Sequence, residues 1–238
     1  FTVDRIGFTF QQQIEFSKSY ILSYDYTFER NHTFDSNLEG NQSIDTTVNV
    51  GTLSAALTRD TRDDILNASR GMFLSHRLGY APGLLSSDVR FIRYFVQYYT
   101  FNKLNDFLIH ASGLRIGLSK GLGQDLIPSE RFFAGGGATM RGFEKDEVGP
   151  KSPYTGLAEG GEAVFVLYKE LSGVVFVDLG NVYSKASNFN PFTVRKAAGF
   201  GLRFNTRFVL LRFDWGFKLD RRPGESLSKV FFSIGQAF

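Results

Sequence analysis

The feature that most constrains this chain is a repeated alternation of apolar and polar residues with a period of two. Between residues 6 and 16, Gln12 is the one polar interruption on a parity that is otherwise apolar. The opposite parity runs from Gly7 to Glu15 and is polar apart from its glycine. Successive side chains of a β-strand point to opposite faces, so this segment predicts a strand with one apolar and one polar face.

The same pattern recurs along the whole chain and predicts eleven strands. The expected ranges are 6–16, 20–29, 45–59, 72–80, 88–101, 107–119, 162–170, 175–180, 198–205, 209–218 and 229–238, with 45–59 the least regular. Short and long connections alternate between them, except that 58–71 is long where a short turn is expected. Alternating hairpin lengths and alternating lipid-facing and lumen-facing residues are typical of outer-membrane barrels.

We therefore expect an all-β fold, an antiparallel transmembrane β-barrel with about 11–12 strands in this chain. A soluble sandwich or propeller would not alternate its connections in this way, and no run of about 18 apolar residues predicts a membrane helix. Single-chain bacterial barrels have an even number of strands. We expect residues 1–238 to be one barrel domain that is N-terminally incomplete; a smaller barrel of twelve strands, or one closed by a second chain, is the alternative.

Composition excludes several other classes of protein. The net charge is +3 with basic residues scattered among acidic ones, so we expect no nucleic-acid partner. The chain has no cysteine, and its three histidines, His32, His76 and His110, lack metal-ligand spacing. Because no arrangement of nucleophile and base stands out either, we expect no metal, no cofactor and no enzymatic activity.

The longest segment without alternation, about 120–160, contains a glycine-rich motif, Arg131–Phe143. The motif includes Gly135, Gly136 and Gly137 and ends in Arg141-Gly142-Phe143. A phosphate-binding loop is a poor reading, because the Gly-Lys-Ser/Thr ending is absent and no helix follows. A second motif, Phe176-x-Asp178-x-Gly180, lies on a later strand, and the chain ends on Phe238.

Together these motifs resemble the C-terminal barrel of the BamA/TamA superfamily of outer-membrane insertases, the bacterial surface antigen family. Residues 58–71 also resemble a turn signature of that family, with Ala68 where proline is usual. The resemblance covers nearly the whole chain. It implies a sixteen-strand barrel, of which this chain would supply the last eleven strands, and a loop at about 120–160 inserted into the lumen.

The resemblance also implies roles for individual residues. Arg141 would pair inside the lumen with acids of the inner wall, Glu170 and Asp178. The alternation independently places both acids on the polar, lumen-facing parity, although a solvated Arg141 at a loop tip is the alternative. The C-terminal strand would carry the assembly signal and a weak lateral seam, and its candidate residues are Phe232, Ile234, Gly235 and Phe238.

By resemblance, the protein would insert β-barrel clients into the bacterial outer membrane through that seam. Its expected partners are the lipid bilayer, unfolded outer-membrane clients, and accessory periplasmic or lipoprotein subunits. A two-partner-type secretion translocon, or the barrel anchor of a patatin-like fusion, is the alternative. We expect no periplasmic repeat domain within these residues.

Overall fold

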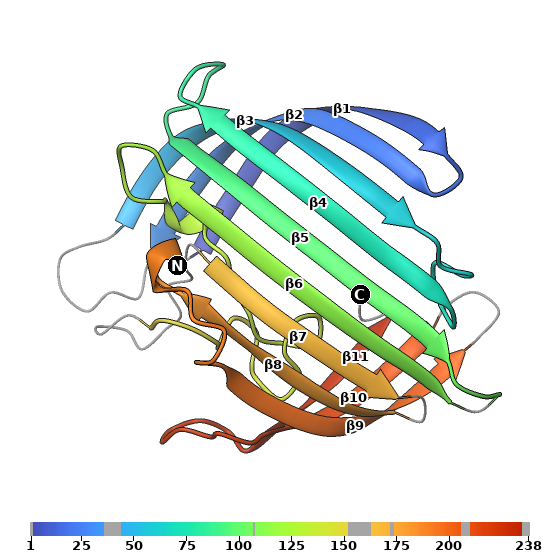
Figure 1. The fold of residues 1–238 in the computed structure, drawn as a ribbon. Helices are drawn as coiled ribbons and strands as arrows, with labels where there is room; N and C mark the ends of the chain where they lie inside the picture. Colours follow the sequence, from blue (N-terminus) through green and yellow to red (C-terminus); the bar gives the residue numbers. More distant parts are fainter. Residues whose placement is uncertain are drawn as a thin grey trace.

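The computed structural model describes residues 2–35, 44–106, 108–151, 163–171, 174–205 and 210–234; for 163–171 it describes the backbone. These residues form a single 11-stranded antiparallel sheet in which every strand pairs with its neighbours in chain order (Figure 1). The strands are β1 (Thr2–Ser17), β2 (Tyr20–Asp35), β3 (Ile44–Asp60), β4 (Gly71–Pro82), β5 (Arg90–Lys103), β6 (Ile109–Gly121), β7 (Ala163–Leu171), β8 (Val175–Tyr183), β9 (Arg195–Asn205), β10 (Leu210–Lys218) and β11 (Ser228–Ile234).

The two faces of the sheet divide as the alternation predicts. On the outer face large apolar side chains are exposed, among them Phe10 at 71% and Val230 at 63%. On the inner face polar and charged side chains are buried, among them Asp25, Asp178 and Asp214. An exposed apolar face on an antiparallel sheet is the arrangement that a bilayer stabilises, because only alternate residues meet lipid.

The largest difference from the expected strand ranges is at the end of β2. That strand was expected over 20–29, but the polar stretch 30–35 continues it, in register with β3 as far as Asp35 opposite Ile44. Arg30 and His32 break the alternation because the outer face of a strand that projects beyond the apolar band meets water, while Asn31 between them is buried on the lumen face. Backbone pairing then continues although the outer face is no longer apolar. An apolar face at every second residue is the signal by which a strand is predicted from sequence.

The sheet curves around an interior, and among the described strands β1 and β11 do not pair to close a barrel. Figure 1 shows the connection between β6 and β7 lying on the concave side of the curved sheet. We call its described part, residues 122–151, the lumen loop; a short 3₁₀ helix, Pro128–Glu130, lies within it, and a second, Ala186–Asn188, follows β8. In the ranges that the structure describes, no helix is both long and apolar enough to span a membrane.

The buried core forms where the lumen loop meets the inner wall. One apolar cluster contains the loop residues Ala134, Met140, Phe143 and Val148 with Val182 of β8 and Ala197 of β9. A second cluster packs Leu126 of the loop against β3, β4 and β5 through Val50, Ala81 and Phe91. The interior of this barrel is therefore filled by its own loop over the described residues.

Candidate functional site

Glycines allow the lumen loop to fold into a compact unit. Gly135 and Gly136 have φ angles of +121° and +94°, a backbone conformation that residues with a Cβ atom rarely adopt. A Cβ on Gly135 would lie 2.2 Å from the carbonyl oxygen of Glu144, so the loop backbone could not close around it. Antiparallel bridges join Ala134 to Val148 and Gly136 to Met140. The glycine cluster thus serves chain folding inside the lumen.

This folding delivers Arg141 to the inner wall at β8. The Arg141 side chain donates from Nε to Asp178 Oδ2 at 2.8 Å and from Nη2 to Asp178 Oδ1 at 2.7 Å. The Arg141 backbone N–H also donates to Asp178 Oδ2, at 2.9 Å. Arg141 is 1% exposed and Asp178 is fully buried. A two-pronged contact of this kind fixes both position and orientation, because the planar guanidinium matches the carboxylate.

Two aromatic side chains of the site stack with cations, Phe176 with Arg141 of the pair and Phe143 with cations of β9 and β10. The guanidinium carbon of Arg141 lies 3.6 Å from the centroid of the Phe176 ring, two residues before Asp178 on the same face of β8. Phe143 is fully buried, and the cations of Arg195 and Lys218 lie 4.7 and 5.3 Å from its ring centroid. Desolvated cations over aromatic rings are attracted by the ring quadrupole. The motif therefore binds the wall through charge and through stacking.

The loop backbone also touches the wall directly, at β10. Gly142, with φ +92°, lies so close to Gly216 that a Cβ on Gly216 would be 2.4 Å from the Gly142 nitrogen. A Cβ on Gly142 would lie 3.1 Å from the backbone of Gly216 and 3.2 Å from Cβ of Ala197. Glycine on the lumen-facing parity of β10 thus makes room for the loop.

A second anchor, at Glu130, was not expected from the sequence. The buried Glu130 carboxylate accepts from Arg93 Nη2 of β5 at 2.8 Å and from Asn31 Nδ2 of β2 at 3.3 Å. Arg5 of β1 donates from Nη2 to the Ser129 carbonyl oxygen at 2.6 Å. Nothing in the spacing of these residues links them. Of the five, Arg93 alone lies in an expected strand, on its lumen-facing parity, and that was the one available signal.

Further ion pairs hold the loop to the last strands. Lys218 of β10 donates to Glu147 at 2.7 Å, and Lys229 of β11 lies 2.7 Å from Glu144. Gly137 lies against β11, because a Cβ there would be 3.1 Å from the Phe231 side chain. The loop therefore contacts β11 from the lumen side.

Arg195, one of the two cations near the Phe143 ring, has carboxylate partners of its own. Arg195 donates to Asp220 at 2.7 Å and to both oxygens of Glu225, at 3.0 and 2.7 Å. Burial acts to raise the pKa of Glu225, but hydrogen bonds from the Arg195 guanidinium and the Arg222 backbone N–H outweigh it and lower the pKa to about 2. The Glu225 carboxylate therefore stays ionised at neutral pH and keeps Arg195 in place.

The remaining candidates divide into two groups. Gly180 is buried on the lumen side of β8, and Phe232 and Ile234 are exposed on the outer face of β11. The side chain of Glu170, and all of Gly235 and Phe238, lie outside the described residues. Two acids were expected to pair with Arg141, and the structure shows Asp178 in that role. The contacts of the site as a whole hold the lumen loop against the inner wall. Within the described ranges, no three potential metal-ligating side chains lie close enough together to hold an ion.

Comparison with known proteins connects this geometry to a family. The chain is 27% identical over its full length to an outer membrane protein assembly factor BamA from Nitratidesulfovibrio vulgaris (strain Hildenborough), and it spans about a third, 32%, of that protein. Its fold is similar to that of BamA from Haemophilus ducreyi lacking POTRA domains 1-3, with a TM-score of 0.79, 17% identity and coverage of 98% of this chain and 54% of the other.

A second solved structure, CdiB from Acinetobacter baumannii, is similar with a TM-score of 0.61 at 15% identity. It covers 98% of this chain, which spans 42% of CdiB. The sequence also matches the Omp85 superfamily domain over residues 1–238. That match, the all-β sheet and the likeness to the BamA barrel show that this chain is an outer-membrane protein belonging to the Omp85 superfamily.

Proposed function

We propose that this protein assembles β-barrel clients into the outer membrane by offering them the edge of β11. Membership of the Omp85 superfamily and the likeness to BamA support outer-membrane protein insertion as the general activity. The observation that carries the finer proposal is β11 itself. Its described part spans seven residues, Ser228–Ile234, and among the described strands it pairs with β10 alone, as β1 at the other end of the sheet pairs with β2 alone.

The edge of β11 can act as a template for a client strand. Backbone N–H and C=O groups along that edge would pair with a client, a mode of recognition that depends on main-chain hydrogen bonds and not on client sequence. The lumen loop contacts β11 from inside at Lys229 and Phe231, so the wall would stay in place while a client pairs with that edge. No covalent chemistry is needed, and the protein on this account is not an enzyme.

A second candidate function is the secretion of one dedicated partner protein through the lumen. The fold similarity to CdiB favours it, since that structure covers nearly the whole chain. The buried loop argues for the insertase, because a lumen filled by Arg141, Phe143 and their partners must be cleared before a polypeptide could pass.

Site-specific crosslinking separates the two. A photoreactive residue placed at Ile234 in the full-length protein should capture an unfolded β-barrel client added to liposomes. The same residue at Leu118, which is also on the outer face but lies on the doubly paired strand β6, should not. Equal capture at both positions, or capture of clients at lumen positions instead, would contradict the proposal.

A further inference from the structure

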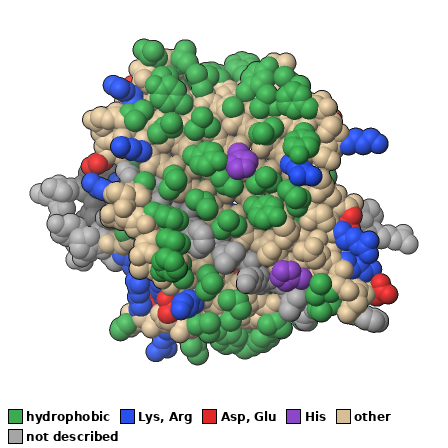
Figure 2. Space-filling view, viewed as in Figure 1, with side chains coloured by type: hydrophobic (Ala, Val, Ile, Leu, Met, Phe, Trp, Pro, Cys, Tyr) green, Lys and Arg blue, Asp and Glu red, His purple; other side chains and the backbone are tan. Residues whose placement is uncertain are grey.

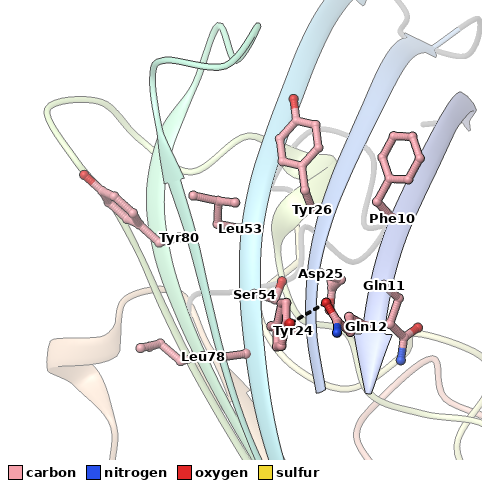
Figure 3. Close-up of a pocket in the computed structure, with 11 residues that line it drawn as sticks. Phe10, Gln11, Gln12, Tyr24, Asp25, Tyr26, Leu53, Ser54, Leu78 and Tyr80 are labelled. Atoms are coloured by element: carbon pink, nitrogen blue, oxygen red, sulfur yellow. Dashed lines mark hydrogen bonds between the residues drawn. The ribbon is translucent and has the colours of Figure 1, made fainter. Parts of the chain in front are cut away.

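The outer wall carries a hollow over β1 to β4. Figure 2 shows hydrophobic side chains gathered on the outer face of the sheet, and Figure 3 shows the residues around the hollow. Its volume is about 640 Å³, within the range of about 300–1,000 Å³ that small-molecule sites occupy. Most of the side chains that line it are apolar or aromatic and face away from the lumen, among them Phe10, Tyr24, Tyr26, Leu53, Leu78 and Tyr80.

The hollow exists because Ala55 is small where its neighbours are large. Ala55 lies in register between Tyr24 of β2 and Leu78 of β4, one pleat from the row formed by Tyr26, Leu53 and Tyr80. A methyl group beside these longer side chains leaves unfilled space above it. In a wall surrounded by bilayer, that space is open to lipid.

Hydrogen bonds keep the neighbouring rings from closing the space. The Tyr24 hydroxyl donates to Oε1 of Gln12 on β1, the bond drawn as a dashed line in Figure 3. The Tyr26 hydroxyl donates to the Leu85 carbonyl oxygen at 2.7 Å. These contacts explain why Gln12 interrupts the apolar face of β1: its amide holds a ring that would otherwise fold over the hollow.

A cation lies on the same face, toward the end of β3. Arg59 is four residues beyond Ala55, a separation of about 13 Å along a strand. Its guanidinium carbon lies 5.4 Å from the centroid of the Tyr20 ring. Across the described part of the chain, Arg59 forms no ion pair with a carboxylate. An arginine beside a tyrosine at the rim of an apolar band is typical of the membrane interface, where it meets lipid phosphate.

We propose that this surface binds one glycerophospholipid, with its phosphate against Arg59 and one acyl chain extending past Leu57 into the hollow over Ala55. The hollow is continuous with the wall that meets the bilayer, which makes lipid its natural occupant. Apolar contact alone would not select a molecule, because the surrounding tails are equally apolar. Selection arises because the charge of Arg59 lies about 13 Å along the strand from the hollow, so that the phosphate and one acyl chain of the same lipid would reach both.

Native mass spectrometry of the full-length protein in detergent tests this site. Titration with 1-palmitoyl-2-oleoyl-phosphatidylglycerol should show one retained lipid. Ala55→Phe, which fills the hollow, and Arg59→Gln should each weaken retention about tenfold, the effect of losing one good contact. Arg59→Lys should retain most of the binding. Ala198→Phe and Lys196→Gln, on the outer face of β9, are the matched controls and should bind as the unchanged protein does.

Three results would overturn the proposal. The first is unchanged retention of phosphatidylglycerol in either test variant. The second is equal retention of a diacylglycerol that has the same chains but no phosphate. The third is a protein that retains lipid A but does not retain phosphatidylglycerol. Heat-dependent gel mobility confirms the folding of each variant, and Ala55→Val provides a smaller filling if Ala55→Phe does not fold. Arg59→Gln alters an exposed side chain, so it tests the phosphate contact independently of the hollow.

Discussion

At the scale of single residues, the lumen loop depends on a charge that the interior would otherwise exclude. A buried guanidinium without partners costs several kcal/mol, and Asp178 and Phe176 together offset that cost for Arg141. Parity in the sequence placed Asp178 on the correct face, and the family resemblance supplied Arg141 as its partner. The stacking of Arg141 on Phe176 could not be anticipated. Alternation predicts which face of the strand Phe176 occupies, but not how far its ring lies from a loop residue.

Gly216 offers a direct test of the close approach between loop and wall. Gly216→Ala places a methyl group against the Gly142 nitrogen and should destabilise the barrel by about 1–3 kcal/mol, the usual cost of overpacking. Heating followed by gel electrophoresis, in which folded barrel runs ahead of unfolded, measures the midpoint temperature. Gly79→Ala is the matched control, because its Cβ would meet nothing nearer than 3.6 Å. Equal midpoints for the two variants would rule the contact out as a constraint.

At the scale of elements, alternation predicted the strands, whereas the insertion of the loop at about 120–160 into the lumen was expected from the family resemblance and its detailed contacts were not predicted. Alternation reports the environment of each face, so every strand that crosses an apolar band was found; residues 30–35 were missed where β2 leaves that band. The lumen loop has no period. The contact of Glu130 with Arg93 and Asn31 depends on how β2, β5 and the loop meet in space, which local sequence does not encode.

The Glu130 anchor should hold the first part of the lumen loop on its own. Glu130→Gln removes the charge opposite Arg93 and should weaken this contact by about 1–3 kcal/mol. Because proteolysis follows local opening, trypsin should cleave after Arg131 several-fold faster in the variant. Asp125→Asn is the control, because Asp125 lies in the same loop but its side chain is exposed. Cleavage rates that match between the two variants would refute the anchor.

At the scale of the whole molecule, the loop ties together strands that are distant in the sheet. Its contacts reach β1, β2 and β5 at one end and β8, β10 and β11 at the other. Between these two groups, Arg115 of β6 donates to the Ala138 carbonyl oxygen of the loop at 2.8 Å. The loop therefore braces the wall from inside, and in the proposed function this bracing supports the edge of β11.

The measurement that tests this account most directly is the rate at which the full-length protein, in liposomes, folds an unfolded β-barrel client when the charges of Arg141 and Asp178 are exchanged. Breaking the buried pair costs about 3–5 kcal/mol, so Arg141→Glu alone should release the loop and slow client folding strongly. Arg141→Glu combined with Asp178→Arg should recover part of the rate. A single variant as active as the unchanged protein, or a double variant no better than the single, would contradict the account.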